Sequence, residues 1–86
     1  MSIITFLKNL KFGDENDWVV CNNGWFDACT WTDTRLGAGH VPVQYMFIQI
    51  ENVGNGKMYY RGDIQSEAEL KSAVTQLLQV VKIYRR

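Results

Sequence analysis

The chain has 86 residues, of which 47% are hydrophobic and 13% aromatic. This is the composition of a folded protein, and the length allows one modest core, so we expect a single domain over residues 1–86. Nine basic and nine acidic residues cancel. Without a basic excess, a protein that grips long nucleic acid electrostatically is disfavoured.

The first twelve residues, MSIITFLKNLKF, form an apolar run that Lys8 and Lys11 interrupt. This run is too short for a signal peptide or a membrane span, and no later apolar run approaches twenty residues. Two cysteines do not form the disulfide framework that small secreted domains use. We therefore expect a soluble, cytoplasmic protein that makes no contact with a membrane.

Apolar residues at helical spacing predict an N-terminal helix over residues 3–10, with Ser2 as a candidate cap. An acidic connection, DENDW, follows it. The segments DWVVC and WFDACTW are rich in β-branched and aromatic residues, which predicts two strands. Asn22-Asn23-Gly24 between them is typical of a tight hairpin turn.

The next stretch, TDTRLGAGHVP (residues 32–42), contains two glycines and the only proline. This composition predicts a loop. Loops of this length are uncommon in small domains and are often functional.

The segments VQYMFIQIEN and KMYYRGDI predict a second hairpin, joined by Gly54-Asn55-Gly56. A two-residue loop would set Ile48 and Ile50 opposite Arg61 and Tyr59. A three-residue loop would pair residue 46 with 64, 48 with 62 and 50 with 60, with Gly56 at a left-handed bulge position. We prefer the second register because it gathers apolar side chains on one face.

Ser66 and Glu69 form the pattern of a capping box, which predicts the start of a long C-terminal helix. Its apolar stripe consists of Leu70, Val74, Leu77, Leu78 and Val81. Together these elements predict an α+β fold: a two-layer sandwich with a four-stranded, mostly antiparallel sheet, a short N-terminal helix and a long C-terminal helix.

Cys21, Cys29 and His40 are the residues closest to a reactive constellation. A two-residue first turn would put the cysteines on opposite faces, and a three-residue turn would separate them by roughly 13 Å. Neither allows a disulfide or a shared metal, and the spacing lacks the CxxC or HxxxH of a zinc site. A Cys29–His40 dyad would need the loop to fold back. We predict no catalytic residues, no metal and no cofactor.

The second face of the sheet is the stronger functional signal. In the preferred register it carries aromatic residues and an arginine, the residue types enriched at interface hot spots. We predict a partner-binding surface centred on Tyr45, Phe47, Tyr59 and Arg61, with Trp31 and Arg35 at its edge. The alternative is that the N-terminal helix or part of the 32–42 loop covers this face.

Residues 51–70, ENVGNGKMYYRGDIQSEAEL, combine a hairpin, a strand ending in Asp and a helix with a Ser-Glu cap. This quarter of the chain resembles the corresponding part of small phage-encoded anti-CRISPR proteins. The resemblance implies a stoichiometric inhibitor or adaptor, of phage or mobile-element origin, that binds a bacterial host-defence protein or complex. Those families share no common site, so the resemblance implies no functional residues.

Two other functions remain open at this point. A small-ligand or nucleotide-binding domain, or a homodimer that uses the same sheet face, would have a pocket lined by Trp25, Trp31, Asp33, Arg35 and His40. A single-stranded RNA binder would stack bases on the exposed aromatics. The neutral net charge and the absence of a K-G-F-G-F-like run count against RNA.

Overall fold

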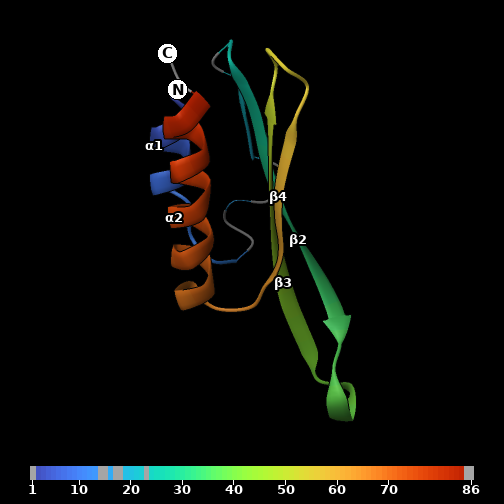
Figure 1. Ribbon diagram of the computed structural model, residues 1–86. Helices are drawn as coiled ribbons and strands as arrows, with labels where there is room; N and C mark the ends of the chain where they lie inside the picture. Colours follow the sequence, from blue (N-terminus) through green and yellow to red (C-terminus); the bar gives the residue numbers. More distant parts are fainter. Residues whose placement is uncertain (1, 14–15, 17–18, 23, 85–86) are drawn as a thin grey trace.

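A computed structural model describes residues 2–13, 16, 19–22 and 24–84 (Figure 1). The elements in chain order are α1 (Ile3–Lys8), β1 (Val19–Asn22), β2 (Phe26–Leu36), η2 (Ala38–His40), β3 (Pro42–Asn52), β4 (Met58–Ile64) and α2 (Glu67–Tyr84). The strands form one antiparallel sheet in the order β1-β2-β3-β4, and both helices lie on the same side of it. The predicted α+β fold is confirmed. Residues 14, 15, 17 and 18 of the predicted acidic connection, and Asn23 of the first turn, lie outside the described residues.

The N-terminal helix begins where the sequence predicts it. The Ser2 hydroxyl accepts a hydrogen bond of 3.1 Å from the Thr5 backbone N–H, which satisfies one of the unpaired donors of the first turn. The helix ends at Lys8, two residues before the predicted end. Ile3, Phe6 and Leu7 are buried, so the predicted apolar face is the one that packs.

The C-terminal helix has the predicted cap with one change in partner. The Glu69 N–H donates to the Ser66 hydroxyl at 3.2 Å, as a capping box requires. The Glu69 carboxylate accepts from the N–H of Gln65 at 2.7 Å, one residue before the position that a capping box uses. Leu70, Leu77 and Val81 of the predicted stripe are buried, together with Ala73.

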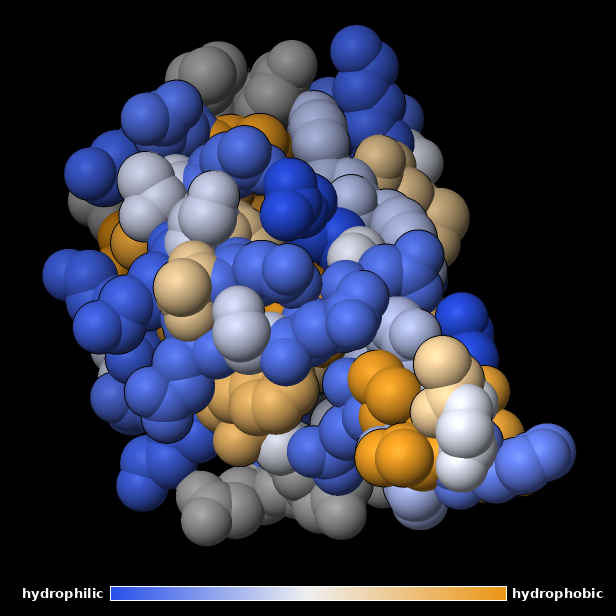
Figure 2. All heavy atoms as spheres, turned by 90° about the horizontal axis from the view of Figure 1, so that it is seen from below, coloured by the Kyte–Doolittle hydropathy of each residue, from blue (hydrophilic) through white to orange (hydrophobic). Residues whose placement is uncertain are grey.

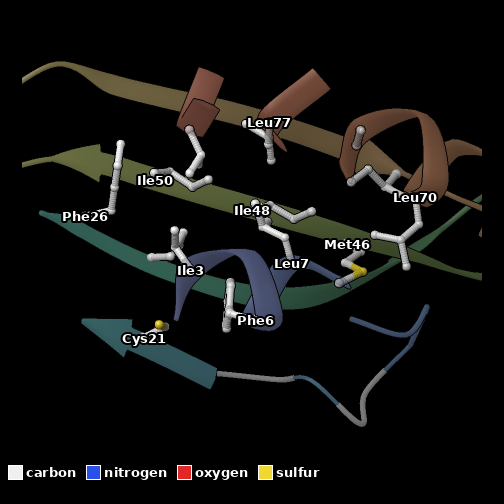
Figure 3. Close-up of a cluster of buried hydrophobic side chains, with 14 residues drawn as sticks. Ile3, Phe6, Leu7, Cys21, Phe26, Met46, Ile48, Ile50, Leu70 and Leu77 are labelled. Carbon is white, nitrogen blue, oxygen red and sulfur yellow. The ribbon is translucent and has the colours of Figure 1, made fainter. Parts of the chain in front are cut away.

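The core lies between the two helices and one face of the sheet (Figure 3). Ile48 and Ile50 on the central strand β3 have no exposed surface, and Leu7, Leu70 and Leu77 reach this layer from the helices. Thr30, the polar side chain in the same layer, donates a hydrogen bond of 2.7 Å to the Phe47 carbonyl. Its hydroxyl is therefore satisfied although it is fully buried.

The predicted loop over residues 32–42 is wrong. β2 and β3 pair continuously from Phe26↔Asn52 to Leu36↔Pro42, so most of this stretch is strand. The turn is confined to the residues between them, where the Gly37 N–H donates to the Val41 carbonyl at 2.8 Å. Pro42 is tolerated because it is the first residue of its strand.

The far ends of β2 and β3 project from the sheet as a two-stranded arm. Within the described residues, β1 pairs with β2 as far as Thr30, and β4 pairs with β3 as far as Met46. Beyond these positions the arm runs past the end of the helix layer, which makes the molecule elongated at 48 × 21 × 20 Å (Figure 1). Leu36 and Val41 at its end are 68% and 58% exposed, and apolar residues gather there in Figure 2.

The pairing of β3 with β4 agrees with the preferred register at one end of the strands and differs from it near the turn. Met46 pairs with Ile64, but a bulge separates this pair from Ile48↔Arg61 and Ile50↔Tyr59, which belong to the register that we did not prefer. The turn explains the shift, because the Asn52 side chain accepts from the Gly54 N–H at 2.9 Å and its carbonyl accepts from Gly56 at 2.8 Å. This turn is one residue longer than the predicted one, so the β3 residues near it pair with β4 residues one position earlier than predicted.

β1 and β2 also pair in neither of the two predicted registers. Cys21 lies opposite Ala28, and Val20 lies opposite Cys29, so the turn is longer than expected. Opposite residues share a face, which places Cys21 in the core and Cys29 on the other side of the sheet. Both are free thiols.

Replacing the cap residue tests the C-terminal helix. We expect Ser66→Ala to lower the free energy of unfolding by about 1 kcal/mol, because the Glu69 N–H loses its acceptor. Urea denaturation followed by circular dichroism measures this change. Ser72→Ala, on an exposed position of the same helix, is the matched control and should change stability by less than about 0.5 kcal/mol.

Candidate functional site

The face of the sheet that points away from both helices is called here the outer face. Because side chains alternate along a strand, it carries the odd-numbered residues of β2 and β3. No described helix covers it, since α1 packs on the same side as α2. Neither of the covers considered from the sequence, the N-terminal helix or a 32–42 loop, lies over it.

The outer face carries an aromatic cluster: the rings of Trp31, Phe47 and Tyr60 contact one another, and Tyr45 is connected to them through Arg35. Trp31 and Phe47 lie opposite each other on β2 and β3, and their rings stack with centroids 5.4 Å apart and planes 6° apart. The Tyr60 ring lies 6.5 Å from Trp31 and 6.2 Å from Phe47. Phe47 is only 6% exposed, so its neighbours bury it on an otherwise open face. The contacts stabilise the cluster as a rigid unit.

Arg35 lies across one edge of this aromatic cluster. Its guanidinium is 4.8 Å from the Tyr45 ring centroid and 5.7 Å from that of Phe47. Asp33 holds it through a 3.1 Å contact to Nε, and Asp63 lies 3.6 Å from Nη1. About half of the Arg35 side chain remains exposed, so the group is oriented by its neighbours and still accessible to a partner.

Tyr60 is the surface residue that the sequence missed. The preferred register puts Tyr60 on the helix side, whereas the actual register pairs it with Gln49 on the outer face. A Cβ at Gly62 would lie 2.6 Å from Cζ of Tyr60, so the absence of a side chain there makes room for the ring. A glycine two residues after an aromatic residue is the sequence signal that could have indicated this ring position.

The predictions for Tyr59 and Arg61 as outer-face residues are wrong, for the same reason. Tyr59 pairs with Ile50 and packs against the core. The Arg61 guanidinium donates a hydrogen bond of 2.6 Å to the Gln76 side chain of α2. Both side chains therefore lie on the helix side of β4. Tyr45, Phe47 and Trp31 lie on the predicted face, and Arg35, which was predicted in a loop at its edge, lies on the same face as part of β2.

The outer face is acidic. It carries four carboxylates, Asp27, Asp33, Glu51 and Asp63, against the single guanidinium of Arg35. Since the whole chain is formally neutral, the remainder carries the compensating positive charge. Asp27 and Glu51 lie directly opposite each other, an unfavourable like-charge pair. Asp27 Oδ1 is buried and accepts no hydrogen bond from the described residues.

The alternative ligand pocket does not assemble. Trp25 precedes the start of β2, and His40 lies in the turn after its end, so about 33 Å of strand separates them. Trp31, Asp33 and Arg35 do lie together on the outer face. They form part of a surface and do not line a pocket with Trp25 and His40.

Cys29 lies on the outer face opposite Gln49, and His40 is at the far end of the arm. The length of β2 between them keeps the two side chains apart, so the described structure does not bring Cys29 and His40 together as a dyad. Burial raises the pKa of the Cys29 thiol, which opposes the thiolate that a nucleophile needs. Within the described part of the chain, no three His, Cys, Asp or Glu residues are grouped closely enough to hold a metal ion.

Comparison with protein-family models, with curated proteins and with solved structures finds no match to this chain. Among the helices in the described ranges, none combines the length and the apolar character needed to cross a membrane. The assignment of function therefore depends on the geometry of the outer face.

Filling the space at Gly62 tests the arrangement of the aromatic cluster. We expect Gly62→Ala to displace the Tyr60 ring from Trp31 and Phe47 while the fold is retained, because the Tyr60 side chain can rotate into solvent. Nuclear Overhauser contacts between the Tyr60 and Trp31 rings should be lost. Ser72→Ala, on an exposed position of α2, should leave these contacts intact.

The raised thiol pKa predicts slow alkylation of Cys29. A higher pKa leaves a smaller thiolate fraction at pH 8 than in an unperturbed cysteine, so iodoacetamide should modify Cys29 more slowly than a short cysteine peptide. The rate should rise with pH through and beyond the ordinary thiol range. Peptide mass spectrometry distinguishes Cys29 from the buried Cys21. Rapid modification at pH 7 would contradict this and favour a Cys29-dependent enzyme.

Proposed function

We propose that this protein is a non-enzymatic binding protein, a stoichiometric inhibitor or adaptor, that binds a partner protein through the outer face of its sheet. The observation that carries this proposal is the uncovered cluster of Trp31, Tyr45, Phe47 and Tyr60, with Arg35 held against it. Aromatic and arginine side chains on a rigid sheet are the anchors of protein interfaces, where single residues contribute about 2 kcal/mol or more.

The charge of the outer face selects the class of partner. Four carboxylates around one guanidinium repel the phosphates of RNA, so base stacking on these rings is disfavoured. The same like charges oppose pairing of two outer faces in a homodimer. A protein surface that presents basic groups around an apolar centre is complementary. It would also supply a donor for the unpaired Asp27 Oδ1.

The biological class of the partner follows from the resemblance of residues 51–70 to small phage-encoded anti-CRISPR proteins. We propose a bacterial host-defence protein or complex as the partner, with the chain acting in the cytoplasm of the host. The rigidity of the aromatic cluster supports stoichiometric inhibition, because a preorganised surface loses little conformational entropy on binding. The raised pKa of Cys29 and its distance from His40 support a role without catalysis.

A pull-down with matched variants tests this proposal. Tagged protein is incubated with nuclease-treated bacterial lysate, beside a Tyr45→Ala/Arg35→Ala double variant. We expect one stoichiometric protein band that the double variant loses, because it removes an aromatic anchor and the oriented guanidinium. The band should weaken as salt is raised, since the complementarity is partly ionic.

Arg61→Ala is the control for this experiment. It removes the same charge from the helix side of β4, so the band should be retained. Circular dichroism of all variants establishes that they are folded. If the double variant keeps the band, or Arg61→Ala alone removes it, the outer face is not the binding surface. A lane without any stoichiometric band would contradict the proposal for the lysate used.

A further inference from the structure

The helix layer contains an open groove where α1 ends and the N-terminal half of α2 continues past it. Its volume is about 650 Å³, within the range of small-molecule sites. α1 has only six residues, whereas α2 has eighteen. The chain therefore leaves the helix layer before it covers the whole of α2. This groove is on the opposite side of the sheet from the outer face, and its function is independent of the proposed one.

Apolar side chains form part of both walls of the groove, Leu7, Leu10 and Phe12 on one side and Leu70 and Val74 on the other, and Thr75 and charged side chains complete the lining. Leu7 and Leu70 are buried, whereas Leu10, Phe12 and Val74 are half-buried and present apolar surface to the opening. The Lys11 N–H donates to the Asn16 side chain at 3.1 Å, which holds the backbone beside Leu10 and Phe12 in place.

The rim of the groove is basic. Lys8, Lys11 and Lys71 line it, with Glu67 as the single acidic side chain. None of the three lysines forms an ion pair with another described residue. Lysine stems lie along apolar surface and place their amines at its edge. An apolar groove with an excess of two positive charges at its rim is complementary to an anion that carries an apolar chain.

We propose that this groove binds an acyl-chain carboxylate, with the chain against Leu10, Phe12 and Val74 and the carboxylate at the amines of Lys11 and Lys71. The acyl chain would cover half-buried apolar side chains and so remove their surface from water. The lysine amines would gain the counter-ion that the described residues do not supply. The outer face is acidic, so its aromatic surface lacks the cationic rim that a carboxylate needs.

Titration of the isotope-labelled full chain with sodium dodecanoate, below its micelle concentration, tests this site. We expect amide shifts in proton–nitrogen spectra confined to residues 7–12 and 67–75. Lys11→Gln and Lys71→Gln should each weaken binding about threefold, and the double variant about tenfold, as expected for partly exposed ion pairs. Lys57→Gln and Lys82→Gln, outside the groove, should leave the affinity unchanged.

Two further probes separate the contributions of charge and chain. Dodecyltrimethylammonium has the same chain with a cationic head, and acetate has the same head without the chain; both should bind much more weakly. Equal shifts with the cationic detergent would overturn the proposal in favour of unspecific apolar adsorption. The absence of shifts with dodecanoate, or shifts centred on the outer face, would also overturn it. Shifts of the groove residues with protein concentration alone would identify a second copy as the occupant.

Discussion

The pairing of β2 with β3 is the constraint on which the rest of the molecule depends. Eleven consecutive residue pairs, from Phe26↔Asn52 to Leu36↔Pro42, hold the two longest strands in one register. Since side chains alternate, this register sends Thr30, Ile48 and Ile50 to the helix side and Trp31 and Phe47 to the outer face. A slip of one residue would exchange the two sets, exposing the core and burying the aromatic cluster.

The same pairing extends beyond the sheet that supports it. β1 and β4 are shorter than the two central strands and leave their distal ends as a two-stranded arm. An isolated pair of strands is marginally stable in water, so the arm depends on its continuity with the four-stranded part. Asp33 lies near its base and Arg35 lies further along it, and the Arg35 guanidinium contacts both Asp33 and Asp63 from the end of β4. This contact joins the arm to the edge of the sheet.

The register of β4 decides whether Tyr59 or Tyr60 lies on the outer face, and a bulge of one extra residue changes this register along the strand. Near the turn, Tyr59 faces the core and Tyr60 faces outward, and the bulge returns Ile64 to the core side. Asp63 has a left-handed backbone, φ 55°, at this bulge. The irregularity thus satisfies two requirements that a regular strand could not meet together: Tyr60 joins Trp31 and Phe47, and Ile64 is buried.

Charge divides between the two sides of the sheet although the chain is neutral. The outer face is acidic around its aromatic cluster, and the helix side has lysines around an apolar groove. A count of charges along the sequence cannot reveal this division, because the fold decides which side of the sheet each charged residue occupies. The two surfaces of opposite charge therefore share no residues, so the two proposed ligands would not compete for the same side chains.

Local signals in the sequence determined both helices and the class of the fold. The Ser2 cap, the Ser66 cap and the spacing of Ile3, Phe6, Leu70 and Leu77 act over a few residues, and each predicted feature is present. Trp31, Tyr45 and Phe47 were placed correctly on one face because strand alternation is also local. Arg35 was predicted in a loop at the edge of this surface, and only its position on β2 puts it on the same face.

Only the tertiary structure decided the length of the central strands, the register of β4 and the division of charge. Residues 32–42 have the composition of a loop, and they become strand because β3 supplies hydrogen-bond partners from a distant part of the chain. The position of Tyr60 depends on the Asn52 turn and on the bulge at Gly62 and Asp63, and the pairing of β4 with β3 decides how the two combine. The groove beside Lys11 and Lys71 exists because a short helix packs against a long one, a relation between segments some sixty residues apart.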